Sequence, residues 1–317
     1  MKKSKPRSCE VRVPASSANL GAGFDCFGLA LNLFLTVRAT VQSGPSARSE
    51  ARTRGIDGSA ALPSTAEENL ILRAMHHAAE RHGLRLPPVH LAVQNQIPIA
   101  GGLGSSAAAI VAGTTLGFAV CGKKPTEENV LRLAAEMEQH TDNVGAALLG
   151  GLVVSCVGAG GNVVALRKRW PKQIRVIAVT PKMTLQTAAS RAALPPTIEH
   201  VAAVYNLQRS ALFLAALDDR RDDLLWEAMQ DRLHQSYRQS LIPGLAEVLA
   251  IPRMPGLLGV ALSGSGPTVI ALATRNLAQI GKALAGQFAR RGLTPTIRNL
   301  TVAQEGIQLN GKPLAKK

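Results

Sequence analysis

The chain has 317 residues, about the size of two domains, and its 46% hydrophobic and 18% charged residues are enough to form packed cores. Lysine and arginine outnumber the acidic residues by 36 to 21, which gives a formal net charge of +15. These figures exclude a disordered or collagen-like chain, but the charge makes nucleic acid a partner to consider.

The basic residues alone do not indicate a nucleic-acid surface. They are spread along the chain, and aromatic residues make up only 3%, whereas proteins that bind single strands stack bases on aromatic rings. No apolar run reaches the roughly 20 residues of a membrane span. The basic start, residues 1–7, lacks the apolar segment of a secretory signal, and Cys9, Cys26, Cys121 and Cys156 form no metal-binding or disulfide pattern. We expect a cytoplasmic protein with reduced thiols and no membrane association.

Hydrophobic periodicity in the first half predicts strands separated by helices. Residues 16–23 are expected to form a glycine-bearing loop and residues 42–64 a surface loop, because neither has a period that buries one face. Thr65 begins a capping-box pattern for a helix that Gly83 ends. The other predicted elements are strands at 11–13, 34–41, 87–93, 151–157 and 162–166 and helices at 105–120 and 125–140.

The second half is predicted to be a separate α+β unit. A basic stretch at 167–172 is the expected boundary, which divides the chain into an N-terminal domain at 1–169 and a C-terminal domain at 170–317. The predicted elements are strands at 174–179, 257–262, 269–273 and 296–302 and helices at 187–194, 198–217, 222–239 and 277–291.

A glycine-rich loop at 98–106 lies between a predicted strand and the start of a helix. Glycine lets the backbone approach a phosphate closely, and a helix start offers unpaired N–H groups to an anion. Ser105 or Ser106 adds a hydroxyl for a phosphate oxygen or a magnesium ion. The loop lacks the GK[ST] of a Walker A sequence, and a glycine-rich turn with serine as helix cap remains the alternative.

Three further segments carry candidate polar groups. Asn19 and Asp25 lie in PASSANLGAGFD, where an Asx turn is the alternative to a binding site. Glu136 and Glu138 lie about 200° apart on a predicted helix, so only one of them can face the loop serines, and the periodicity does not say which. His140 is expected to orient the following turn. The loop at 263–268, SGSGPT, is equally compatible with a tight turn and with a phosphate-binding site.

Taken together and in this order, PASSANLGAGFD, PIAGGLGSSAAA and LSGSGPT resemble the GHMP kinase superfamily, and within it the homoserine kinases. The resemblance covers residues 11–302, and the GEH-bearing first motif of galactokinases and mevalonate kinases is absent. It implies an α+β, two-domain GHMP kinase fold. The N-terminal domain would be ribosomal-protein-like α/β, the C-terminal domain ferredoxin-like α+β, and ATP would bind in the cleft between them.

The resemblance also implies where an amino-acid substrate binds. Arg191 and Arg238 would hold its carboxylate, which suits planar guanidinium groups, although in isolation both read as surface arginines. Asp25 would receive the ammonium group and Thr187 would assist. The implied substrate-binding set is Asn19, Asp25, Asn143, Thr187, Arg191 and Arg238.

The catalytic and phosphate-binding residues follow from the same resemblance. Asn19 and Asn143 would position the substrate hydroxyl for in-line attack, and Asp142 is the one nearby candidate for a general base. Magnesium would be held by Ser106 and Glu136, with Glu138 as the alternative. The implied ATP-binding residues are Pro98, Ile99, Ala100, Gly101, Gly102, Leu103, Gly104, Ser105, Ser106 and Gly264.

The implied activity is ATP- and magnesium-dependent phosphorylation of L-homoserine to O-phospho-L-homoserine, in threonine biosynthesis. A homodimer is one option for the oligomeric state, which the sequence leaves open. Two alternatives stay open at this point. One is a GHMP kinase for another small alcohol, and the other is a basic nucleic-acid-binding protein, which only the net charge supports.

Overall fold

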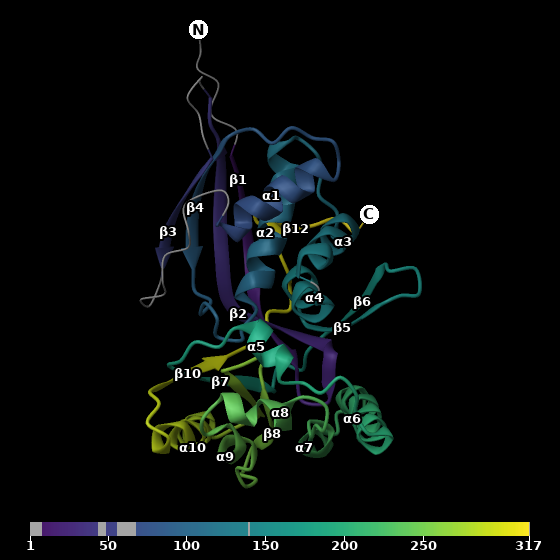
Figure 1. Cartoon of the computed structure of the whole chain (residues 1–317), viewed down its shortest axis with the longest axis vertical. Helices are drawn as coiled ribbons and strands as arrows, with labels where there is room; N and C mark the ends of the chain where they lie inside the picture. Colours follow the sequence, from purple (N-terminus) through teal and green to yellow (C-terminus); the bar gives the residue numbers. More distant parts are fainter. Residues whose placement is uncertain (1–7, 44–48, 56–67, 139, 317) are drawn as a thin grey trace.

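The computed structural model describes residues 8–43, 49–55, 68–138 and 140–316, and its two sheets follow one another along the long axis of the molecule (Figure 1). A long antiparallel hairpin of β1 (Ser8–Asn19) and β2 (Gly23–Val41) forms the centre of the first sheet. The glycine-bearing loop expected at 16–23 is therefore wrong in extent. Pairing continues to Asn19, opposite Gly23, because this segment is buried between the two halves of the molecule.

The first sheet has the strand order β12-β11-β1-β2-β4-β3, and β5 pairs with both β2 and β6. The surface loop predicted at 42–64 is wrong at Glu50–Gly55, which forms a strand parallel to β4. The remaining strands are β3 (Glu50–Gly55), β4 (Val89–Asn95), β5 (Leu152–Val157), β6 (Val163–Lys168), β11 (Gln308–Leu309) and β12 (Lys312–Pro313).

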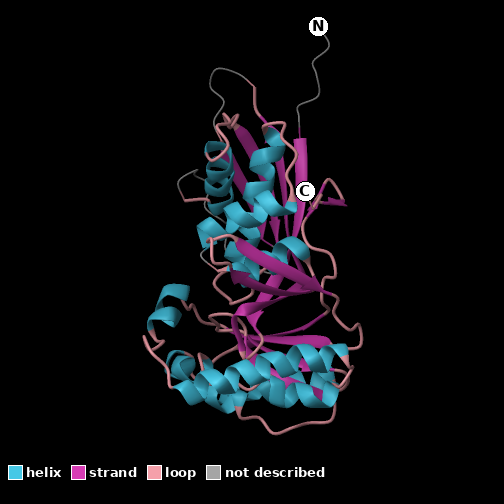
Figure 2. Cartoon of the chain, turned by 90° about the vertical axis from the view of Figure 1, so that its right-hand side faces the viewer, coloured by secondary structure: helices cyan, strands magenta, loops and turns pink. Residues whose placement is uncertain are grey.

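Four helices cover one face of this sheet (Figures 1 and 2). They are α1 (Leu70–Glu80), α2 (Ser105–Val120), α3 (Glu127–Glu138) and α4 (Thr141–Leu149). The side chain of Asn69 caps α1 by accepting from the N–H groups of Ile71 and Leu72, whereas the capping box predicted from Thr65 lies outside the described residues. Helix α2 begins at Ser105, as predicted, and is buried over most of its length.

The helix predicted at 125–140 ends at Glu138, and a second helix, α4, starts at Thr141. No helix is predicted from the sequence at Thr141–Leu149. The break turns the chain so that Asp142 and Asn143 lie in the first turn of α4, against the hairpin of β1 and β2.

The second sheet is antiparallel and has the order β10-β7-β9-β8. Most of its helices lie on the side away from the first sheet, whereas α5 (Thr187–Ala192) lies between the two sheets (Figures 1 and 2). Its strands are β7 (Arg175–Pro181), β8 (Leu257–Leu262), β9 (Val269–Ala273) and β10 (Pro295–Leu300). Its helices are α5 (Thr187–Ala192), α6 (His200–Asp218), α7 (Leu225–Ala228), α8 (Gln235–Arg238), α9 (Leu245–Leu249) and α10 (Leu277–Arg290).

The single helix predicted at 222–239 is wrong. The chain forms a 3-10 turn at Asp222–Leu224 and the short helices α7 and α8. Between them, the carboxylate of Asp231 accepts the backbone N–H groups of Leu233, His234 and Gln235. A carboxylate that binds three successive backbone donors competes with helix formation at this point.

The end of the chain returns to the first sheet. After β10, Val302 bridges to Leu31, and β11 pairs with β1. The division at 169/170 is therefore too simple, because the last residues pack with the N-terminal sheet and not with the C-terminal one. Trp170 and Phe213 also share one buried core with residues of both sheets, so the two halves meet over an apolar contact. Among the described residues, no helix is long and apolar enough to cross a membrane.

Candidate active site

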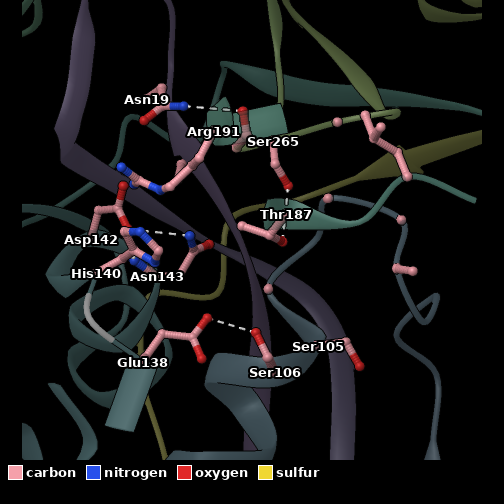
Figure 3. A pocket seen from close by; sticks show the side chains of 18 of the residues that line it. Asn19, Ser105, Ser106, Glu138, His140, Asp142, Asn143, Thr187, Arg191 and Ser265 are labelled. Atoms are coloured by element: carbon pink, nitrogen blue, oxygen red, sulfur yellow. Dashed lines mark hydrogen bonds between the residues drawn. The ribbon is translucent and has the colours of Figure 1, made fainter. Parts of the chain in front are cut away.

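The predicted loops meet between the two sheets, around a pocket of about 390 Å³ (Figure 3). Pro98 and Leu103 do not line it, since Leu103 is fully buried beneath the loop, and Glu136 is also absent from its wall. The predicted residues that line it are Asn19, Asp25, Ile99, Ala100, Gly101, Gly102, Gly104, Ser105, Ser106, Asp142, Asn143, Thr187, Arg191, Arg238 and Gly264.

Hydrogen bonds to backbone carbonyl groups hold the three motif loops together. The Ser263 hydroxyl donates to the Gly102 carbonyl at 2.6 Å, and the Gly264 N–H donates to the Ala18 carbonyl at 3.1 Å. Gly102 has a φ of +76°, and a Cβ there would lie 2.7 Å from the carbonyl oxygens of Ser263 and Gly266. Only glycine lets the phosphate-loop candidate pack this closely against the second sheet.

Ser106, in the first turn of α2, donates to Glu138 Oε1 at 2.6 Å. The sequence predicts Glu136 as the carboxylate beside this serine, with Glu138 as the alternative, and the structure places Glu138 there. Glu136 points away from Ser106 and instead contacts His77, Arg81 and Arg132 on the outer surface of α1 and α3. The two glutamates lie on different sides of α3, so a helix that turns Glu138 toward the pocket necessarily turns Glu136 out.

Glu138 is half-buried and has no cationic side chain within ion-pair distance among the described residues. Burial raises the pKa of its carboxyl group, and the hydrogen bond from Ser106 lowers it in part. A hydroxyl and a carboxylate at this separation are hard oxygen ligands of the kind that Mg²⁺ takes. The residues present therefore fit a magnesium ion shared with phosphate oxygens.

Charged groups gather at the other end of the pocket. Arg191 Nη2, on α5, donates to Asp25 Oδ1 at 2.7 Å, and about two fifths of each side chain is exposed. Arg238 is 2% exposed, and its guanidinium donates to the carbonyl oxygens of Ser190 and Gly264 and to the ring of His234. Burial and the neighbouring Arg191 lower the pKa of Arg238 to about 10.

The charge of Arg238 is thus surrounded by neutral acceptors. A buried guanidinium without a carboxylate partner is unfavourable, and an anionic ligand in the pocket relieves that cost. Phe24 forms the wall beside both arginines, with its ring centre 5.8 Å from the guanidinium carbon of Arg191 and 5.5 Å from that of Arg238. The geometry suits a ligand that carries a carboxylate and a cation close together.

Two asparagines lie between the charged end and the phosphate loop. Asn19 Oδ1 accepts from the Asp25 N–H at 3.0 Å, and its Nδ2 donates to the Gly264 carbonyl at 3.1 Å. Asn143 Oδ1 accepts from the Ser16 hydroxyl at 2.8 Å, while its Nδ2 donates to Asp142 at 3.2 Å. These partners fix both amide groups and leave each with one N–H to offer to a ligand.

Asp142 is almost completely buried and binds Asn143 through one oxygen, accepting from its backbone N–H at 2.6 Å and from its side chain. Burial raises the pKa of Asp142 to about 7, with a smaller contribution from the charge of Asp25. A carboxyl group with this pKa can accept a proton near neutral pH, but its observed contacts orient Asn143.

Thr187, at the start of α5, lies 3.3 Å from Ser265 through their hydroxyl groups. Ser190 on the same helix donates to the Ser265 carbonyl at 2.9 Å. These contacts anchor α5 to the SGSGPT loop, so Arg191 is held over the pocket by the third motif.

Sequence reasoning missed several residues at the pocket. Phe24, His140 and Ser265 line it, and Ser16 orients Asn143 from below. Burial and Arg191 lower the pKa of His140, so its ring is neutral at neutral pH. Phe24, Ser16 and Ser265 lie inside the quoted motifs, and this position is the one feature of the sequence that could have indicated them. Their contacts join residues far apart in the chain and could not be read from spacing.

Known proteins that are similar in sequence to this chain are GHMP kinases. The chain matches the GHMP kinases N terminal domain over residues 69–151 and the GHMP kinases C terminal domain over residues 213–290. A homoserine kinase from Desulfitobacterium hafniense is 41% identical over 298 residues, which covers 93% of this chain and 98% of that protein. One from Saccharomyces cerevisiae is 34% identical and covers 95% of this chain and 98% of its own.

Solved structures with a similar fold include kinases. The crystal structure of a homoserine kinase from Cytophaga hutchinsonii superposes with a TM-score of 0.83 at 28% identity, over 98% of this chain and 99% of that one. A mevalonate kinase from L. major, at 15% identity and a TM-score of 0.65, shares the fold alone. With two GHMP domains, near-complete coverage by relatives above 30% identity and a pocket lined by all three motifs, this chain belongs to the homoserine kinase family of the GHMP kinases.

Proposed function

We propose that this enzyme transfers the γ-phosphoryl group of ATP to the hydroxyl group of L-homoserine, giving O-phospho-L-homoserine and ADP on the route to threonine. The observation that carries the proposal is one pocket with two chemically different ends. Ser106 and Glu138 lie on the phosphate-loop side, and Asp25, Arg191 and Arg238 lie on the opposite side. Relatives at 34–42% identity that bear the name homoserine kinase support it.

The charged end suits an α-amino acid. The carboxylate is assigned to Arg238 and Arg191, because paired guanidinium groups form charge-assisted hydrogen bonds with planar anions. The ammonium group is assigned to Asp25. Since Arg191 and Asp25 already form an ion pair, a zwitterion exchanges one ion pair for two: its ammonium group faces Asp25 and its carboxylate faces both arginines. Mevalonate and galactose lack the ammonium group, so Asp25 favours homoserine over these alcohols as the substrate.

The phosphate end is assigned to ATP. Gly101, Gly102 and Gly104 present backbone to the pocket, and the first N–H groups of α2 face an anion favourably. Mg²⁺, held by Ser106 and Glu138, would neutralise charge on the phosphates. Ser106 would bind the ion through its hydroxyl oxygen, and Glu138 would stay ionised because the cation would offset the effect of burial on its carboxyl group.

In this proposal the protein catalyses the reaction mainly by positioning the substrate hydroxyl. Phosphoryl transfer asks the protein for in-line alignment and charge stabilisation more than for covalent chemistry. The fixed amides of Asn19 and Asn143 lie between the two ends and place the substrate hydroxyl, while Asp142 holds Asn143 in orientation. We rank Asp142 as a general base below this role.

The proposal is tested by ADP release, coupled to a dehydrogenase, from the purified enzyme with L-homoserine, mevalonate, galactose and shikimate. Phosphate transfer from labelled ATP to homoserine alone is the expected result. Activity on an alcohol without an amino group, and none on homoserine, would replace the proposed substrate. Salt-sensitive nucleic-acid binding without kinase activity would instead support the basic binding protein. The cytoplasmic location and a homodimer remain predictions, the latter checked by sedimentation velocity.

A further inference from the structure

His234 lies completely buried beneath the charged end of the pocket and does not line it. Its Nε2 is 3.0 Å from the carbonyl oxygen of Gly21, in the first motif. Its Nδ1 is 3.0 Å from Nη1 of Arg238, one helical turn further along. The ring therefore bridges the first motif and the arginine of α8, which are more than 200 residues apart in the chain.

These two contacts determine the protonation state of the ring. A carbonyl oxygen only accepts, so Nε2 must carry a proton, and a guanidinium only donates, so Nδ1 must offer its lone pair. The neutral Nε2–H tautomer is thus the one form that satisfies both contacts. An imidazolium would place an N–H against the N–H of Arg238 and set a second positive charge beside it.

Other groups around His234 agree with a neutral ring. Burial lowers its pKa, and the charge of Arg238 also lowers it; the charges of Asp231 and Asp25 raise it only in part, so the pKa stays below the ordinary value. Asp231 Oδ2 is 3.8 Å from Nε2, but both oxygens of Asp231 already accept hydrogen bonds, from three backbone N–H groups and from Asn206. The ring of Phe24 stacks on that of His234, with centroids 5.0 Å apart and planes at 19°, which fixes the ring plane.

Arg238 receives its orientation from three neutral acceptors: the Ser190 carbonyl on Nε, and the Gly264 carbonyl and His234 Nδ1 on Nη1. Nη2 has no acceptor among the described residues, and Arg238 lines the pocket. The acceptors are uncharged, so they fix the guanidinium without neutralising it.

We propose that His234 is a positioning residue for Arg238: its Nδ1 lone pair holds the guanidinium so that Nη2 and the uncompensated charge remain available to the carboxylate of the substrate. This rests on the proposed function for the identity of that carboxylate. It predicts that loss of the Nδ1 acceptor weakens binding of the amino acid and leaves binding of ATP at the other end of the pocket unchanged.

Two amide variants separate the two ring nitrogens. Asn Oδ1 occupies nearly the place of His Nδ1, so His234→Asn keeps an acceptor for Arg238 and loses the contact with Gly21. Gln Nε2 occupies nearly the place of His Nε2, so His234→Gln keeps that contact and loses the acceptor. Both variants lose the stacked ring, which makes each the control for the other. His200→Gln, at an exposed histidine on α6, controls for the substitution itself.

We expect His234→Gln to raise the KM for homoserine about tenfold, the value of one hydrogen bond of about 1.4 kcal/mol, with the KM for ATP unchanged. His234→Asn should stay within about threefold of the wild type. Equal KM values for homoserine in the two variants, or an equal loss toward both substrates, would overturn the proposal. Thermal unfolding of each variant shows whether it is folded.

A second measurement depends neither on variants nor on activity. The ¹⁵N resonances of the ring of His234 in the wild-type protein should show a protonated Nε2 and an unprotonated Nδ1 from pH 6 to 8. A protonated Nδ1 in this range would overturn the proposal. A wild-type enzyme that shows the expected tautomer but does not phosphorylate homoserine would contradict the proposed function and the carboxylate assignment, while the contact between His234 and Arg238 would stand.

Discussion

Ser106 and Glu138 form a 2.6 Å hydrogen bond at the edge of the pocket, although they belong to different helices and lie 32 residues apart. The bond shows which side of α3 faces the phosphate loop. Glu136, two residues earlier, consequently lies outside, in an ion-pair cluster with Arg81 and Arg132.

The two glutamates form a matched pair of variants. Glu138→Gln should lower kcat about 100-fold or more and raise the Mg²⁺ concentration needed for half-maximal rate, because a ligand charge is lost where phosphate charge is neutralised. Glu136→Gln should leave both quantities within about twofold, since it removes only partly exposed ion pairs. Steady-state rates measured against Mg²⁺ concentration check this. A larger loss with Glu136→Gln would restore the original assignment.

Arg238→Ala should raise the KM for homoserine about 10- to 100-fold and change the KM for ATP little, because charge-assisted hydrogen bonds to the carboxylate are lost at one end of the pocket only. Arg85→Ala, at an exposed arginine remote from the pocket, is the control for loss of a positive charge. If affinity for both substrates falls in parallel, Arg238 supports the fold and not the substrate.

Asp142→Asn should retain most of the turnover, since asparagine keeps an oxygen that can accept from the N–H groups of Asn143. The measurement is kcat with saturating homoserine and ATP from pH 6 to 9. Near-total loss would show that the ionised carboxylate is needed as a base. In that case the wild-type kcat should also rise with pH through about 7, the pKa of Asp142.

The same variant tests the cost of burying this carboxyl group. Its pKa is raised by burial to about 7 in the folded protein, so its stabilising contribution is complete below the unfolded value near 3.8 and is lost as the pH rises through 7. Asp142→Asn should therefore gain stability relative to the wild type as pH increases from 4 to 8, by up to the order of 4 kcal/mol. Thermal unfolding of both proteins over this range measures the difference, and a constant difference would exclude the raised pKa.

Gly104→Ala should abolish activity. Gly104 has a φ of +69°, and a Cβ there would lie 2.0 Å from the Ser16 hydroxyl that orients Asn143. Gly292 has a similar φ of +77° with nothing within 4 Å of a Cβ, so Gly292→Ala carries the backbone strain without the clash. We expect Gly292→Ala to cost about 1 kcal/mol of stability and leave kcat intact. Comparable activity of the two variants would show that the loop tolerates displacement.

The local sequence is enough to predict several elements of the fold and most residues of the pocket. The start of α2 at Ser105 is predictable, because a glycine-rich loop precedes a long apolar run. The three motifs, read in order, indicate the family, and 15 of the predicted site residues line one pocket. The alternation of a strand and the hydrophobic period of a helix depend on residues close together in the chain. Both can therefore be recognised without knowledge of the fold.

Contacts between distant segments decided the rest. The choice of Glu138 over Glu136 depends on how α3 is rotated against α2, and rotation is set by packing. The helix predicted at 222–239 breaks where Asp231 accepts hydrogen bonds from successive backbone N–H groups. The ring of His234 is oriented by its contact with the Gly21 carbonyl, which lies more than 200 residues away in the chain. Sequence determined which chemical groups are present and which loops carry them. Only the tertiary structure decided which groups meet, because burial and hydrogen bonding join residues whose separation in the chain carries no periodic signal.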